Sequence, residues 1–246
     1  MGGLGNQLFQ VNYGLSLSAR KKIPVVFNTY LLRRNLITRF LRWTIHDYIL
    51  DQLIEVKSKF VSSGNLNVIT ASRLPVMQNF SSFYGVHGAP DSDCKNIFGY
   101  FQNRSFIENA GSFINLKPGL LSSHPKYETV MHLRVGDLNE PGYAACYYDR
   151  LLHNIDPSKI HVVTNRSNDL LAFQEKFTKH SFINVSDRSD YDFLTCCNAD
   201  RLLVAPSTFS WWAARLGRQK EVILPEQTFD AIGKPCVNPQ TIQGIL

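Results

Sequence analysis

The chain has 246 residues, of which 44% are hydrophobic and 19% are charged. This composition allows one large core or two small ones and excludes an intrinsically disordered protein. The formal net charge of +6 suits a nucleic acid, a sugar nucleotide or an anionic membrane equally well, so charge alone excludes none of these partners.

The first half of the chain is predicted to begin with a glycine-rich loop at residues 2–7, followed by a helix. The apolar residues on one face of that helix are Leu8, Val11, Leu15 and Ala19. Residues 23–27 have the composition of a buried strand. A parallel α/β fold normally places a strand before such a loop, so we expect that the first strand is missing from this chain.

A region at residues 117–126 that contains Pro, Ser and Gly predicts a domain boundary. We place the two domains at residues 1–120 and 121–246. In the second domain, strands are expected at 129–135, 160–164, 182–185, 202–205 and 222–224. Helices are expected between them, at 147–152, 169–179, 191–198 and 209–216. This alternation predicts a parallel α/β sheet, whose ligands bind at the carboxyl ends of its strands.

The five cysteines form no C-x-x-C pair and are irregularly spaced. They are Cys94, Cys146, Cys196, Cys197 and Cys236. An odd, irregular set is a poor disulfide framework, and it indicates a reducing, cytoplasmic location. We also expect no membrane-spanning segment. The basic residues Arg33, Arg34, Arg39 and Arg42 are either a solvated face or a patch that rests on a membrane surface.

The loop at residues 2–7 offers backbone N–H groups at the positive end of a helix, which favours anion binding. Its candidate residues are Gly3, Gly5, Asn6 and Gln7. The loop does not fit the dinucleotide-binding fingerprint, because Leu8 stands where the third glycine is required. The alternative is a tight turn that needs glycine for positive φ.

His132 and Arg134 occupy alternate positions of a predicted strand and therefore project from the same side, just before a glycine turn. A guanidinium group pairs with two phosphate oxygens at once, so Arg134 is a candidate phosphate ligand in an inter-domain cleft. The alternative is a structural salt bridge between Arg134 and Asp137.

Another polar segment directly follows the strand at 202–205 and starts a helix. It contains Pro206, Ser207, Thr208, Phe209, Ser210, Trp211 and Trp212. Hydroxyl and N–H groups converge there at a positive helix end, which suits a diphosphate. The alternative is that Ser207 or Thr208 only caps the helix while the tryptophans fill the core.

Four segments, taken in order, resemble the motifs of the α-1,2-fucosyltransferases of glycosyltransferase family 11. They are Gly2 to Gln10, Gly99 to Gln102, His132 to Asp137 and Ser207 to Ala213. The first and third also resemble the wider superfamily that contains protein O-fucosyltransferases and α-1,6-fucosyltransferases. The resemblance spans nearly the whole chain.

The resemblance implies an α/β, GT-B-like fold in which two Rossmann-like domains face each other across a cleft. The N-terminal domain would lie on the acceptor side, and the C-terminal domain would bind GDP-fucose. The implied reaction is an inverting, metal-independent transfer of L-fucose to a glycan hydroxyl, with an α-1,2 linkage to galactose. No cofactor and no nucleic acid is implied, and a membrane-borne glycolipid is one option for the acceptor.

The resemblance also implies roles for individual residues. Arg134 would bind the β-phosphate and stabilise the departing GDP, while His132 would contact the nucleotide or the fucose. The donor-binding set would comprise Ser207, Thr208, Phe209 and Ser210, together with Gly3, Gly5, Asn6 and Gln7 of the first loop. Asp192, with Asp190 as the alternative, would accept hydrogen bonds from guanine.

The proton of the acceptor hydroxyl needs a destination. Glu140 is a candidate general base and Asp137 a candidate orienting group, and the departing phosphate is the alternative proton acceptor. The chain departs from the family pattern at Val135, which replaces a second arginine, and at Thr164-Asn165, which replaces a Ser-Asp pair. The rival classes are a catalytically inactive sugar- or nucleotide-binding relic of the same fold and an unrelated Rossmann oxidoreductase.

Overall fold

The computed structural model describes residues 3–22, 24–28, 49–56, 68–69, 80–83, 96–99, 113–134, 141–226 and 239–243. The chain divides into two compact units, Met1–Lys117 (unit 1) and Pro118–Leu246 (unit 2). This division lies close to the boundary expected at residue 120.

Unit 1 combines helix α1 (Leu4–Lys21) with short paired strands. The pairs are β1 (Phe27–Asn28) with β3 (Val68–Ile69), β2 (Ile54–Val56) with β6 (Ile114–Leu116), and β4 (Phe80–Phe83) with β5 (Asn96–Gly99). The β1–β3 and β4–β5 pairs are parallel, and β2–β6 is antiparallel. A short helix, α3 (Leu50–Leu53), directly precedes β2.

Helix α1 is buried on more than the one face that its apolar spacing predicts. Leu8, Val11 and Leu15 are buried as expected, and the polar side chains of Asn12 and Ser16 are buried as well. Gly14 allows close packing, because a Cβ atom there would lie 2.7 Å from the Phe27 ring. The helix therefore lies against β1 at a distance that only glycine permits.

The strand expected at residues 23–27 is only partly present. β1 begins at Phe27, and Val26 is 51% exposed. Pro24 has no N–H group to donate to a ladder, which is a physical reason for the late start of this strand.

Unit 2 contains a six-stranded sheet in the order β12-β11-β10-β7-β8-β9. Its strands are β7 (Thr129–His132), β8 (Lys159–Val163), β9 (Ser181–Asn184), β10 (Arg201–Leu203), β11 (Glu221–Pro225) and β12 (Pro239–Gln243). Neighbouring strands from β9 to β11 are parallel, and β12 is antiparallel to β11. The chain moves outward from β7 through β8 to β9 and then returns to β10 on the other side of β7.

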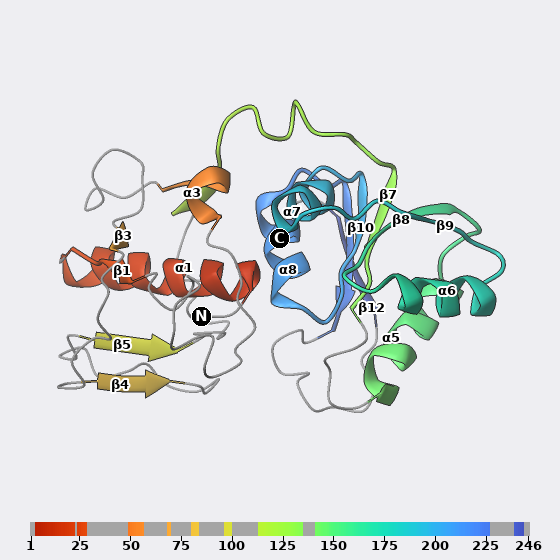
Figure 1. The fold of residues 1–246 in the computed structure, drawn as a ribbon, viewed down its shortest axis with the longest axis horizontal. Helices are drawn as coiled ribbons and strands as arrows, with labels where there is room; N and C mark the ends of the chain where they lie inside the picture. Colours follow the sequence, from red (N-terminus) through yellow and green to blue (C-terminus); the bar gives the residue numbers. More distant parts are fainter. Residues whose placement is uncertain are drawn as a thin grey trace. The chain divides into compact units, whose positions relative to one another are not determined.

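Helices cover both faces of this sheet (Figure 1). They are α5 (Pro141–His153), α6 (Ser167–Lys176), α7 (Ser189–Cys197) and α8 (Thr208–Leu216). Helices α5 and α6 lie on one face, while α7 and α8 lie on the other. Tyr148, Leu152 and Phe173 of the first pair form a buried core with Met131 and Leu133 of the β7 segment. Unit 2 is thus a doubly wound α/β sheet, and the predicted fold class is confirmed.

The structure bears on the expectations about disulfides and about membrane-spanning segments. Cys196 and Cys197 are free and buried, whereas Cys146 is disulfide-bonded. The irregular set that predicted a poor disulfide framework therefore still contains a disulfide. Among the described helices, none is long and apolar enough to cross a bilayer.

Candidate active site

The candidate site lies where β7 and β10 run side by side in the middle of the unit 2 sheet. The strand order reverses direction between these two strands, and open α/β sheets bind ligands outside the carboxyl ends of their strands at such a point. All four residues of β7 are buried. The polar side chains at its end therefore project from a well-packed backbone.

His132 and Arg134 both point to helix α8, as their alternate spacing predicts. The Nδ1 atom of His132 lies 2.9 Å from Ser210 Oγ, and the His132 ring lies 5.1 Å from the Phe209 ring. The Nη1 atom of Arg134 donates to Ser207 Oγ at 2.9 Å. At the carboxyl ends of these central strands, the structure thus brings together two sequence segments that lie more than seventy residues apart.

The amino terminus of α8 is capped by Ser207, whose Oγ accepts from the N–H of Phe209. Trp211 and Trp212 are buried. Ser207 therefore caps the helix and the tryptophans fill the core, and a role of Ser207 in ligand binding stays a prediction. The first turn of α8 contains no acidic residue. A helix dipole and a guanidinium group therefore add positive potential at the same point, which favours a phosphate ligand.

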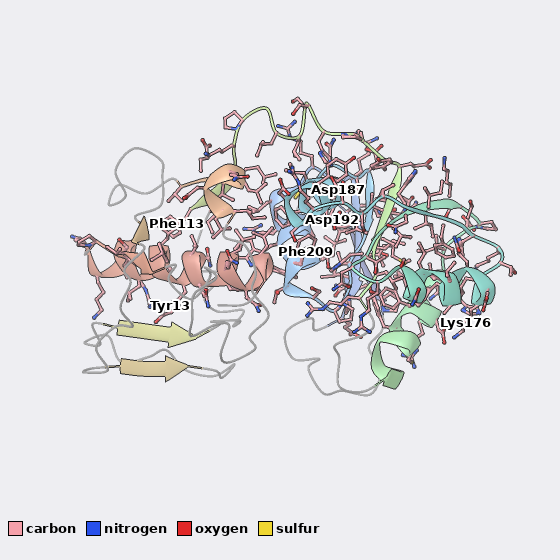
Figure 2. The ribbon with its side chains drawn as sticks, in the orientation of Figure 1. Tyr13, Phe113, Lys176, Asp187, Asp192 and Phe209 are labelled. Atoms are coloured by element: carbon pink, nitrogen blue, oxygen red, sulfur yellow. The ribbon has the colours of Figure 1, made fainter. Side chains whose placement is uncertain are left out.

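Asp192 lies in the first turn of α7 and accepts a hydrogen bond from the N–H of Asp187 at 2.8 Å (Figure 2). Burial raises the pKa of the Asp192 carboxyl group to about 6, and the nearby charges of Asp187 and Asp190 raise the pKa further against the effect of that hydrogen bond. The next residue, Phe193, packs edge to face on Phe209 at 5.4 Å. This contact joins the start of α7 to the start of α8.

Asp190 differs from Asp192 in its surroundings. Its carboxylate pairs with Arg188 Nη2 at 3.2 Å. Arg188 is mostly exposed, so this is a solvated surface pair of small energetic value. Of the two acidic candidates, Asp192 is the one that lies next to the aromatic contact with α8.

The loop expected at residues 2–7 is wrong beyond Gly3, because helix α1 already begins at Leu4. Gly3 is the N-cap of α1 with φ −66° and ψ 175°, and its carbonyl accepts from the N–H of Gln7. Gly5 and Gln7 are buried inside the first turns of the helix, and Asn6 is half-buried. The alternative of a turn that needs positive φ is therefore wrong at Gly3, whereas a role in donor binding stays a prediction.

Several predicted residues lie outside the described part of the chain. These are Asp137 and Glu140, Val135, residues 100–102 of the second motif, and the basic residues Arg33, Arg34, Arg39 and Arg42. The general base and the salt-bridge alternative for Arg134 therefore stay predictions. Among the described residues, no group of His, Cys, Asp and Glu side chains has the arrangement of a metal site.

The structure adds hydrogen bonds at the strand ends that the sequence did not predict. Tyr147 and Tyr148 of α5 donate from their hydroxyl groups to Val204 O and His132 O, both at 2.8 Å. At the end of β8, the N–H of Thr164 donates to Ser186 Oγ at 2.6 Å. In the sequence, these two tyrosines look like residues that only fill the core. Their hydrogen bonds to strand carbonyl groups become visible only in the structure.

Known proteins resemble this chain in fold and only weakly in sequence. No protein-family model matches it, and no curated protein is similar enough in sequence to match. Two solved structures match over 98% of this chain, each with a TM-score of 0.50. One is the NodZ α-1,6-fucosyltransferase soaked with GDP-fucose, at 13% identity and 96% of that chain. The other is the fucosyltransferase NodZ from Bradyrhizobium, at 12% identity and 95%. The chain shares their fold.

Proposed function

We propose that this chain transfers L-fucose from GDP-fucose to a hydroxyl group of a glycan acceptor. The observation that carries the proposal is the pairing of Arg134 with the Ser207-capped start of α8 at the switch point of the unit 2 sheet. A guanidinium group and a helix terminus at this position suit a nucleoside diphosphate. The shared fold with a fucosyltransferase structure soaked with GDP-fucose supports fucose as the sugar.

In the proposed step, the acceptor oxygen attacks the anomeric carbon of fucose while the bond from that carbon to the β-phosphate oxygen breaks. Negative charge grows on the departing GDP, and Arg134 and the α8 terminus stabilise this charge. Attack on the face opposite to the leaving group inverts the anomeric carbon. The acceptor proton passes to Glu140, with Asp137 as its orienting group, or to the departing phosphate.

The remaining donor contacts are proposed from the residues around this centre. His132 lies against Phe209 and Ser210, so it contacts the nucleotide or the fucose. Ser207, Thr208, Phe209 and Ser210 line the diphosphate. Asp192 has one oxygen engaged by the N–H of Asp187, and its carboxylate accepts from N1 and N2 of guanine. We also propose donor contacts for Gly3, the N-cap of α1, and for Gly5, Asn6 and Gln7 in its first turns.

The acceptor linkage is the finer part of the proposal. The family 11 motifs favour an α-1,2 linkage to galactose, whereas the structure of similar fold is an α-1,6-fucosyltransferase. We propose the α-1,2 linkage, a galactose-terminated glycan or glycolipid as acceptor, and no metal ion or other cofactor. A catalytically inactive relic of the same fold is the competing function.

The test is incubation of the whole chain with GDP-fucose and a panel of glycans in the presence of EDTA, followed by linkage analysis of the product. We expect fucose on the 2-hydroxyl of terminal galactose. A product with fucose elsewhere would retain the fucosyltransferase and reject the linkage. Binding of GDP without transfer or donor hydrolysis would instead identify a relic.

A further inference from the structure

The two central strands of unit 2 separate at the candidate site, and hydroxyl groups take the place of the next ladder bonds. β7 and β10 pair in parallel as far as Met131 and Leu203. The N–H of Val204 points to β11, where it donates to Ile223. The following β7–β10 bonds would therefore join His132 O to the Ala205 N–H, and Ala205 O to the Arg134 N–H.

Side-chain hydroxyl groups bind three of these four backbone groups instead, and a backbone N–H binds the fourth. On the β7 side, Tyr148 Oη donates to His132 O at 2.8 Å and accepts from the Arg134 N–H at 3.1 Å. On the β10 side, Ser210 Oγ accepts from the Ala205 N–H at 3.1 Å, and Ala205 O accepts from the N–H of Ser207 at 2.7 Å. Each group is satisfied although the strands have parted, which removes the usual penalty for opening a buried ladder.

The position of the Tyr148 hydroxyl is fixed by packing. The residue is fully buried, and its ring packs edge to face on Phe173 and on Tyr147, both at 5.3 Å. A rigid ring on helix α5 thus delivers one hydroxyl group between two strand ends. That hydroxyl bonds to the backbone of both His132 and Arg134, the two residues that face α8.

We propose that Tyr148 is a positioning residue of the transfer reaction, whose hydroxyl holds the end of β7 apart from β10 and thereby directs the Arg134 side chain. This inference rests on the proposed function. Without the hydroxyl, His132 O and the Arg134 N–H lose these two bonds. Pairing with Ala205 becomes a route that replaces them, once Ala205 exchanges its bonds to Ser207 and Ser210 for the β7–β10 rung. Closure of that rung moves the Arg134 backbone toward β10 and displaces its guanidinium group from the diphosphate.

The experiment compares Tyr148→Phe with Tyr147→Phe in steady-state kinetics with GDP-fucose. Tyr147 is the matched control, because it lies on the same helix, is equally buried and donates to a strand-end carbonyl, that of Val204. We expect Tyr148→Phe to lower kcat by about 10- to 100-fold with a smaller change in KM, as a displacement of about 1 Å would. Tyr147→Phe should keep kcat within about twofold of the wild type while losing similar stability.

A second comparison asks whether Tyr148 acts through Arg134. In an Arg134→Ala background, Tyr148→Phe should cause no further loss of kcat, because the group that it directs is gone. Equal kcat for Tyr148→Phe and the wild type would overturn the inference, and so would full additivity with Arg134→Ala. Absence of transfer by the wild type would instead reject the proposed function.

Ser210→Ala keeps the inference testable if Tyr148→Phe does not fold by circular dichroism. This variant frees the Ala205 N–H on the other side of the same gap. We expect Ser210→Ala to lower kcat in the wild-type background. In the Arg134→Ala background the same substitution should cause no further loss. A folded Ser210→Ala protein with wild-type turnover would contradict the role of the open rung.

Discussion

Arg134 carries a fixed positive charge at the point where, in the proposed reaction, negative charge develops. Its guanidinium group is held by Ser207 Oγ at 2.9 Å. We expect Arg134→Ala to lower turnover by about 10²–10³-fold while the protein stays folded. Arg134→Lys should recover little of this loss, because an ammonium group keeps the charge but not the two-pronged fit to phosphate.

Steady-state kinetics with GDP-fucose, together with circular dichroism, would check this expectation. The exposed Arg218 of the same unit supplies a control, since Arg218→Ala changes the net charge equally and should leave turnover unchanged. Near-normal turnover in folded Arg134→Ala would leave a structural role as the better account of this residue.

Asp192 allows a separate test of base recognition. If its carboxylate accepts from N1 and N2 of guanine, the wild type should bind GDP about tenfold or more tightly than inosine diphosphate, which lacks the N2 amino group. Asp192→Asn should lose this preference. Isothermal titration with both nucleotides measures it, and an unchanged preference in Asp192→Asn would move the role to another residue.

The pH dependence of the same site follows from the raised pKa of Asp192, about 6, which burial causes first. Below that pH the carboxyl group is protonated, so GDP affinity should fall from about pH 7.5 to pH 5 more steeply in the wild type than in Asp192→Asn. The stability of the fold depends on pH in the opposite sense. Because the pKa of Asp192 is higher in the folded state than in the unfolded state, this residue stabilises the fold at low pH, and that contribution is lost as the pH rises through 6. Asp192→Asn should therefore melt higher than the wild type near neutral pH and not near pH 4.

Individual residues of the site were predictable where their position in a strand or helix decides their direction. The alternate spacing of His132 and Arg134 places both on the side of α8, and Ser207 is a favoured N-cap residue. Tyr148 was not predictable, because its hydroxyl acts only after α5 has packed under the end of β7. Nothing local in the sequence separates it from a tyrosine that only fills the core.

At the scale of elements, hydrogen bonds from the carboxyl end of α7 hold residues 121–125, which lie near the start of unit 2. Asn198 Nδ2 donates to the carbonyl groups of Leu121, His124 and Pro125, and His124 Nε2 lies 2.8 Å from Thr195 Oγ1. One buried amide therefore serves three acceptors of a segment without helix or strand.

We expect Asn198→Asp to lower the free energy of unfolding by about 2 kcal/mol or more, because it exchanges the donor for another acceptor facing these carbonyl groups. Asn198→Ala should cost less, since it adds no repulsion. Urea unfolding would measure both, with the exposed Asn168→Ala as control. Equal stability of Asn198→Asp and the wild type would mean that this amide does not hold the segment.

The elements of unit 2 were largely predictable, whereas in unit 1 the prediction was right for helix α1 and for only part of β1. The β-rich runs around Val130, Val162 and Leu202 are short, apolar and followed by turn residues, and each forms a strand. β12 was missed because it starts at Pro239, is half polar and runs antiparallel at the sheet edge, where burial imposes no pattern. β1 is two residues long, too short to carry a period.

For the whole molecule, the proposed site predicts ligand stabilisation without a metal ion. GDP at about 100 times its Kd should add roughly 2.7 kcal/mol to the free energy of unfolding, and the melting temperature should rise by about 5 °C or more in EDTA. NAD should give no such shift, and a shift with NAD instead of GDP would favour an oxidoreductase. A shift that requires added Mg²⁺ or Mn²⁺ would contradict the metal-independent mechanism.

The order of strands in unit 2 also governs when the site can exist. Ser207 and Ser210 come 73 and 78 residues after Arg134 and His132, their partners across the centre of the sheet. Between them the chain must travel through β8 and β9 and return, so these contacts close a long loop and form against its entropy. A partly assembled sheet that stops at β9 contains the end of β7, but it lacks β10 and the start of α8 that lie beside it in the finished fold. If the proposed function holds, affinity for a diphosphate thus requires the completed sheet, and a fragment that ends at β9 should not bind one.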